Sequence, residues 1–171
     1  MRKQKGFSLI ELLIVVAIIL IIAAIAIPNF LRARMAANDS SAAASVRTIN
    51  TAEIAFFGAY PTIGYPAAVT TLGGAFPCTP GTTTACLIDN YLASNGGGNG
   101  KSGYNFNAAG SPSAGSPMND QFFSTGTPFN SLSGTRAYCS IEDAVLRTQP
   151  AGVITLVGSR ATCATLNAMG N

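Results

Sequence analysis

Glu11 is the only acidic side chain in the segment from Phe7 to Ile27, which is otherwise almost wholly apolar. An acid in a membrane helix costs about 2.5–3.5 kcal/mol at mid-bilayer, and less near the interface. We therefore expect a group outside this helix to need the carboxylate. The local alternative is a capping box, because Ser8 and Glu11 fit the S-x-x-E pattern ahead of an apolar run. The substitution Glu11→Gln separates the two readings, since it keeps much of a capping box and removes the charge.

Four cysteines lie downstream of the apolar segment, and their even number favours disulfides if that part of the chain is exported. Three pairings are open, and we favour the local one because short loops close readily. That pairing joins Cys78 to Cys86 and Cys139 to Cys163. A zinc site is disfavoured, since the chain has no histidine and no C-x-x-C pair.

Other candidate chemistry is weak. The segment Asn95–Ser102 nearly matches a phosphate-binding loop, but Asn95 stands where the motif needs glycine, and a strand is expected after it instead of a helix. Glu142 and Asp143 are adjacent, so on a strand they would point to opposite faces. Nothing in the sequence joins them to Asp120 as calcium ligands. We expect a non-enzymatic protein without catalytic, cofactor-binding or metal-binding residues.

The apolar segment carries Glu11, and the residues before the segment predict how the segment is oriented in the membrane. Arg2, Lys3 and Lys5 precede it, which keeps the N-terminus in the cytoplasm and exports the rest of the chain. At about 1.5 Å per residue, Phe7 to Ile27 spans roughly 30 Å, the thickness of a bilayer core. It is too long for the core of a cleaved secretory signal and lacks a convincing cleavage site after it. We expect a retained single-pass helix.

Helical patterning continues beyond the apolar segment. Pro28 removes one hydrogen bond and is expected to kink the helix near 24–28. A stripe of apolar residues then recurs every three or four positions, with Arg47, Asn50 and Glu53 assigned to positions off the stripe. Gly58 and Pro61 end the pattern, which predicts one helix over about 7–57. The stripe consists of Ala42, Val46, Ile49, Ala52 and Phe56.

From Tyr60 onward Gly, Pro, Ser, Thr and Asn dominate. Alternation and turn residues predict a loop region over about 58–100, with a short helix or turn at 87–93, followed by a sheet over about 101–160. The expected strands are 101–108, 121–125, 135–141, 144–148 and 152–157. The fold class is α+β, with the long helix packed across a small antiparallel sheet.

Charge argues against a polyanion-binding role. The net charge of +3 includes Arg2, Lys3 and Lys5, and without them seven basic and seven acidic side chains balance. A nucleic-acid partner is therefore unsupported, although Arg32, Arg34 and Arg47 are basic. We interpret these arginines as interfacial anchors.

The N-terminal residues resemble the class III signal of type IV prepilins, the G-F-[ST]-L-x-E pattern. The match runs through Gly6, Phe7, Ser8 and Glu11 and covers roughly the first 30 residues, including Pro28, which resembles the family's helix-kinking proline. The resemblance implies the pilin fold and a structural subunit of a pilus, or fimbrium. It divides the chain into a leader at 1–6, a helix at 7–57 and a globular region at 58–171.

The resemblance also assigns roles to single residues. A prepilin peptidase is expected to cut between Gly6 and Phe7, where glycine suits a tight pocket, and to N-methylate Phe7. Glu11 is expected to pair with the Phe7 ammonium of a neighbouring subunit, and Pro28 to mark where the helix stretches during assembly. The implied partners are copies of this chain, the peptidase and an inner-membrane assembly platform. The subunit would wait in the inner membrane and then enter an extracellular pilus.

Two alternatives remain at this point. A major pseudopilin of a type II secretion system shares the N-terminus, but that family usually has a C-terminal calcium loop and lacks the disulfides. A membrane-anchored periplasmic binding module would not polymerise, and it predicts no processing at Gly6 and indifference to Glu11. Adhesion, twitching motility, DNA uptake and secretion are not distinguished by the sequence.

Overall fold

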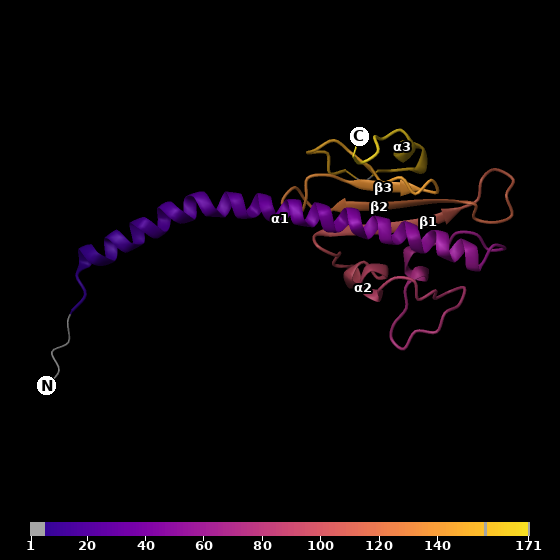
Figure 1. Ribbon diagram of the computed structural model, residues 1–171, viewed down its shortest axis with the longest axis horizontal. Coiled ribbons are helices and arrows are strands. Elements are labelled where there is room, and N and C mark those ends of the chain that lie inside the picture. The colour runs from indigo at the N-terminus through magenta and orange to yellow at the C-terminus, as the bar shows by residue number, and fades with distance from the viewer. Residues whose placement is uncertain (1–5, 156, 171) are drawn as a thin grey trace. The chain divides into compact units, whose positions relative to one another are not determined.

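The computed structural model describes residues 6–155 and 157–170, so the predicted leader lies outside the described residues except for Gly6. The chain forms two compact units, Met1–Arg34 and Met35–Asn171, which we call the apolar unit and the head unit. The boundary between them falls inside the first helix. Figure 1 shows the elements in order: α1 (Leu9–Ala59), η1 (Val69–Leu72), α2 (Asn90–Ala93), η2 (Gly96–Gly98), β1 (Tyr104–Ser111), β2 (Gln121–Pro128), β3 (Tyr138–Ile141), β4 (Arg147–Thr148) and α3 (Arg160–Ala164).

The long helix α1 agrees with the expected range to within two residues at each end. The Ser8 carbonyl accepts its first hydrogen bond, from the Leu12 amide at 3.2 Å. The helix continues through Pro28, although proline has no N–H to donate to the carbonyl four residues earlier. It ends just before Pro61. Among the described residues, α1 is the one helix long and apolar enough to cross a membrane.

The head unit contains a four-stranded antiparallel sheet in the order β1-β2-β3-β4. Strands form in four of the five expected segments, with shifted ends. The fifth prediction, at 152–157, is wrong, because its described residues are turn and irregular structure. The Gly152 amide donates to the Thr135 carbonyl at 2.8 Å and has a φ of +89°, so the chain turns there instead of extending.

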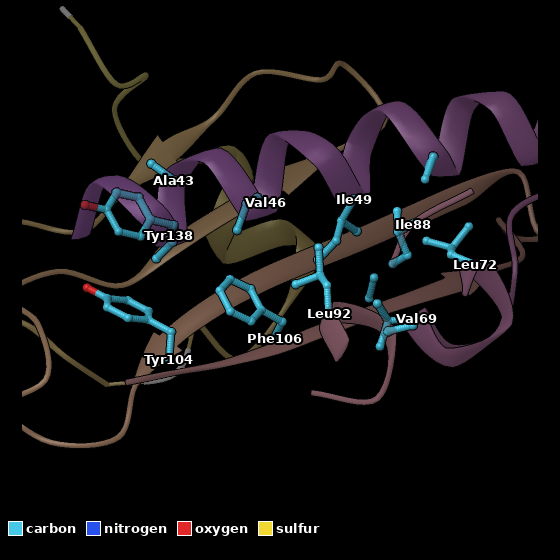
Figure 2. Packing of buried hydrophobic residues seen from close by; sticks show 14 of the residues in the cluster. Ala43, Val46, Ile49, Val69, Leu72, Ile88, Leu92, Tyr104, Phe106 and Tyr138 are labelled. Carbon is cyan, nitrogen blue, oxygen red and sulfur yellow. The ribbon is translucent and has the colours of Figure 1, made fainter. Parts of the chain in front are cut away.

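One face of the sheet packs on the second half of α1 (Figure 2). All five residues of the predicted apolar stripe are buried there. Aromatic side chains from the sheet meet them, and the loop region closes the cluster at one side. Its largest members are Val46, Ile49, Phe56, Leu72, Leu92, Tyr104, Phe106 and Tyr138.

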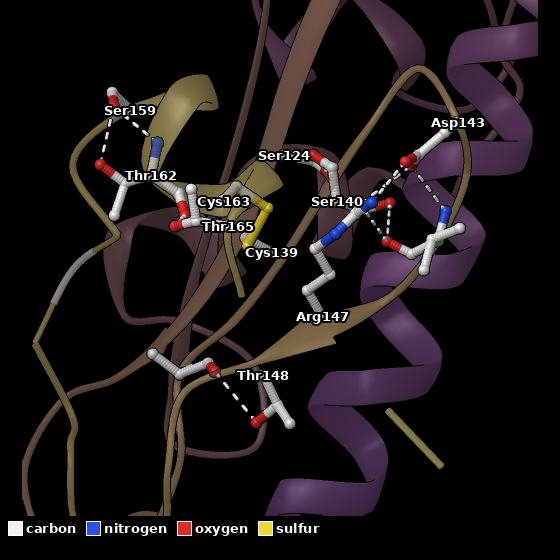
Figure 3. Close-up of a disulfide and its surroundings, with 12 residues drawn as sticks. Ser124, Cys139, Ser140, Asp143, Arg147, Thr148, Ser159, Thr162, Cys163 and Thr165 are labelled. Atoms are coloured by element: carbon white, nitrogen blue, oxygen red, sulfur yellow. Dashed lines mark hydrogen bonds and ion pairs between the residues drawn. A yellow bond between two sulfur atoms is a disulfide. The ribbon is translucent and has the colours of Figure 1, made fainter. Parts of the chain in front are cut away.

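The opposite face carries a smaller cluster under the C-terminal segment. Because successive strand residues point to opposite faces, Tyr138 points to α1 while Cys139 points away from it. The Cys139–Cys163 disulfide holds α3 against this face, with Cα atoms 6.0 Å apart (Figure 3). Ser159 caps α3, accepting from the Thr162 amide at 3.2 Å.

The loop region between α1 and β1 contains the second disulfide, Cys78–Cys86, whose Cα atoms are also 6.0 Å apart. Both disulfides have the predicted local connectivity. The segment Asn95–Ser102 is preceded by α2 and followed by β1, so it lacks the strand-then-helix context of a phosphate loop.

Candidate functional site

The predicted processing residues lie together at the start of α1. Gly6 and Phe7 precede the helix, and the Phe7 side chain is 72% exposed. Glu11 lies in the first turn and is exposed, as Pro28 is further along. An acid in the first turn is stabilised by the positive end of the helix dipole.

Among the described residues, neither the Ser8 nor the Glu11 side chain makes a hydrogen bond or ion pair within the chain. The capping-box interpretation is therefore not realised in this structure. The Glu11 carboxylate is left available to a group from another molecule.

The apolar unit exposes nearly all of its large hydrophobic side chains. In water this much apolar surface is strongly unfavourable, at about 25 cal/mol for each Å² left uncovered. The unit therefore requires lipid or other copies of the same helix as its surroundings. The exposed side chains are Phe7, Leu9, Ile10, Leu12, Leu13, Ile14, Val15, Val16, Ile18, Ile19, Leu20, Ile21, Ile22, Ile25, Ile27, Phe30 and Leu31.

In the head unit, Asp39 fastens α1 to the sheet. Its Oδ1 accepts from the Tyr104 hydroxyl at 2.5 Å and from the Thr135 amide at 2.9 Å, and its Oδ2 accepts from the Thr135 hydroxyl at 2.5 Å. Burial, and then the hydrogen bond to Asp39, raise the pKa of Tyr104. Burial raises the pKa of Tyr138 to about 12. These tyrosines are neutral packing residues at physiological pH.

Two polar residues of α1 lie in the core, contrary to the expectation that both lie off the apolar stripe. Asn50 donates to the Ser140 hydroxyl at 2.7 Å and accepts from the Ser124 hydroxyl at 2.9 Å. Glu53 is 0% exposed, and neither carboxyl oxygen has a hydrogen-bond partner among the described residues. The sequence spacing could have predicted the burial of Glu53, because Glu53 is four residues after Ile49 and lies on the same helix face.

Burial raises the pKa of Glu53 from 4.5 to about 8. A carboxyl group without a charged or hydrogen-bonding partner favours its neutral form, because the interior solvates an ion poorly. The charged form of Glu53 also affects Tyr65. Burial and then the Glu53 charge raise the Tyr65 pKa. Glu53 therefore differs from Glu11 in burial, although the two lie on one helix.

The acidic residues considered as catalytic or metal-binding candidates have other partners. Glu142 and Asp143 lie in the turn after β3, not on a strand, so the argument from opposite strand faces was wrong. Glu142 pairs with Arg160, and Asp143 pairs with Arg147 at 2.5 Å, a bond that lowers the pKa of Asp143. Both are stabilising surface contacts.

Asp120 accepts hydrogen bonds from the Ser113 amide at 2.6 Å and hydroxyl at 2.5 Å, and these lower its pKa. It therefore closes the loop between β1 and β2. In the part of the chain that the structure describes, no three His, Cys, Asp or Glu side chains gather as metal ligands.

Residues 1–27 match the family model described as the prokaryotic N-terminal methylation motif. A segment covering 23% of the chain is 68% identical, over 40 residues, to the type IV wide pilus major component PilA4 of Thermus thermophilus. A segment covering 32% of the chain is 49% identical, over 55 residues, to the type IV major pilin protein PilA of Myxococcus xanthus.

These alignments span 30% and 25% of the two relatives, so the likeness is confined to a minor part of each. No solved structure matches the chain. The structure adds the expected pilin-type arrangement, a long N-terminal helix whose second half packs on a small antiparallel sheet. Residues 1–27 of the chain therefore carry a prokaryotic N-terminal methylation motif.

Proposed function

We propose that this protein is a structural subunit of a type IV pilus, assembled through α1. The observation that carries the proposal is the contrast within that helix. Its first half exposes apolar side chains and one acid that has no partner within the described chain, while its second half is packed on the sheet. A bundle of such helices buries the apolar surface of each one without exposing it to water.

Processing would create the partner that Glu11 lacks. Cleavage between Gly6 and Phe7 gives Phe7 a new ammonium group, which the same peptidase would methylate. Two opposite charges that are each costly in apolar surroundings stabilise one another when they meet. The pairing of Glu11 with the Phe7 ammonium of a neighbouring subunit would therefore select the correct axial register.

Before assembly the subunit would lie in the inner membrane, with residues 7–27 spanning it and the head unit outside the cytoplasm. Each subunit would then join the fibre through a contact that does not close on itself, so that the fibre can grow without limit. Two disulfides and a C-terminal segment with no acidic residue after Asp143 favour a pilus over a secretion pseudopilus.

Electron microscopy of fibres sheared from the cell surface, combined with N-terminal sequencing of their subunit, tests the proposal. We expect thin filaments whose subunit begins with N-methylated Phe7. A membrane-bound monomer that still begins at Met1, in cells without fibres, would contradict the proposal and favour an anchored binding module.

A further inference from the structure

An exposed aromatic side chain stands out on the head unit. Phe76 is 98% exposed, more than any other large hydrophobic residue described. It lies in the loop between η1 and α2, two residues before the Cys78–Cys86 disulfide. A fully exposed phenyl ring in water gains no stability for its own subunit, since it buries no apolar area.

The base of this loop is fixed. The Ala85 amide donates to the Thr71 carbonyl at 2.7 Å, and the Leu87 amide to the Leu72 carbonyl at 2.8 Å. Leu72 itself is fully buried in the core beneath α1. The disulfide shortens the path between the two sides of the loop, so Phe76 is presented on a constrained segment instead of a long free one.

The head unit also has a surface hollow of about 360 Å³. It lies beside β4 and the C-terminal segment and is open to solvent. Its lining mixes polar groups with aliphatic ones. Arg136, Thr148, Pro150, Leu166, Ala168 and Met169 contribute to it.

Backbone hydrogen bonds and a disulfide also fix the walls of the hollow. The Thr148 amide donates to the Asn167 carbonyl at 3.3 Å, and the Met169 amide to the Leu146 carbonyl at 2.8 Å. The Cys139–Cys163 disulfide anchors α3, which leads directly into this wall. Each disulfide therefore supports one of the two surface features.

The loop region and the C-terminal segment that lines the hollow lie at opposite edges of the sheet (Figure 1). The loop region adjoins β1, since the Gly110 amide donates to the Pro66 carbonyl at 2.7 Å. The hollow adjoins β4, the strand at the other edge. A projection on one edge and a hollow on the other allow a head-to-tail contact that repeats from subunit to subunit without closing.

We propose that Phe76 of one subunit inserts into the Arg136–Met169 hollow of the next subunit in the filament. The occupant is a second copy of this chain, and the inference rests on the proposed pilus function. The Arg136 guanidinium supplies a cation for the ring face. The Met169 thioether and the Leu166 side chain supply soft apolar contact for its edge.

The direct test is photocrosslinking in assembled filaments of the full, processed chain. A benzophenone amino acid replaces Phe76, the fibres are irradiated, and crosslinked peptides are mapped by mass spectrometry. We expect crosslinks to residues 148–151 and 165–170 of a different subunit. The same probe at Leu132, an exposed residue (72%) on the β2–β3 loop, is the matched control and should not reach these peptides.

Two substitutions test the contact from both sides. Phe76→Ala removes the projection, and Ala151→Trp fills the hollow, with Leu132→Ala and Ala151→Ser as controls. Loss of one buried phenyl ring should weaken each head contact on the order of ten- to a hundredfold, seen as increased release of subunits from fibres in mild detergent. The controls should release subunits as the unmodified chain does.

The possible failures are distinguishable. If the unmodified chain forms no fibres, the pilus function fails, and this inference fails with it. If fibres form with N-methylated Phe7 but the crosslinks map elsewhere, or both substitutions leave fibres unchanged, only this inference is overturned. An unchanged circular dichroism spectrum of each purified variant shows that the head unit remains folded.

Discussion

Helix α1 carries two glutamates in opposite circumstances. Glu11 is exposed among apolar side chains that are themselves exposed, while Glu53 is wholly buried among side chains of its own head unit. Neither has a hydrogen-bond partner among the described residues. We propose that the first acid meets a partner from another molecule, whereas burial raises the pKa of the second to about 8 and favours its neutral form.

The contrast extends to the two halves of the helix. In the second half, the sheet and the loop region bury the apolar side chains of α1. Asp39 hydrogen-bonds this half of the helix to residues of the sheet and its loop. In the first half, no part of the described chain covers the apolar surface. Stability of the head unit and assembly of the fibre should therefore respond to different substitutions.

Glu11→Gln should have the largest effect, and it should act on assembly alone. An unpaired charge in an apolar helix bundle costs about 2.5–3.5 kcal/mol, which corresponds to about a hundredfold loss of subunit incorporation. Fibre yield is measured against the membrane pool, with processing at Phe7 checked by N-terminal sequencing. Glu53→Gln is the matched control and should assemble as the unmodified chain does. Normal fibres from the Glu11 variant would refute the charge-pairing model.

Among the substitutions, removing the Cys139–Cys163 disulfide should cause the largest loss of head stability. Opening a loop with a sequence separation of 24 costs about 3.5 kcal/mol in the chain-entropy model, against about 2.5 kcal/mol for the separation of 8 in Cys78–Cys86. Both double alanine variants are compared by chemical unfolding of the full chain in detergent, followed by circular dichroism. Equal losses would contradict the expected dependence on loop length.

Glu53 should make head stability depend on pH. Its pKa is about 8 in the folded chain and near 4.5 when exposed, so between these values only the unfolded chain releases the proton. The free energy of unfolding should therefore fall as pH rises from 4.5 to 8, by roughly 3–5 kcal/mol in total, and change no further above that. Glu53→Gln should remove this slope.

Glu142→Gln provides the matched control for that experiment, because Glu142 is partly exposed and paired with Arg160. Its pH profile should keep the downward slope of the unmodified chain. A flat profile for the unmodified chain would mean that Glu53 ionises without cost, through a partner absent from this structure.

Asp39→Ala should have the smallest of these effects. It removes the acceptor for the Tyr104 hydroxyl and for the Thr135 amide and hydroxyl, at a cost of about 2 kcal/mol. Asp39→Asn keeps the Oδ1 acceptor and should cost less than about 1 kcal/mol. Hydrogen exchange of the β1 and β2 amides measures both. An equal loss in the two variants would show that the charge matters more than the acceptors.

The parts of the fold in which a single sequence pattern dominates could be predicted from the sequence. The apolar stripe of α1 is buried as expected, since helical spacing alone places Ala42, Val46 and Ile49 on one face. Four strands appear where alternation predicted them. The short helix α3 was missed because five residues give almost no periodicity, although Ser159 three residues before Thr162 is a capping signal.

The sequence by itself determined the membrane-length helix, its basic N-terminal flank, the processing motif and the pairing of nearby cysteines. These depend on residues close together in the chain, where spacing and composition are sufficient. Only the tertiary structure decided that Glu53 is buried, that Asp39 holds Tyr104, and that the Phe76 loop and the Arg136 hollow lie at opposite edges of the sheet. Those features arise where distant segments meet, and a carboxyl group's environment is set by all of its neighbours in space.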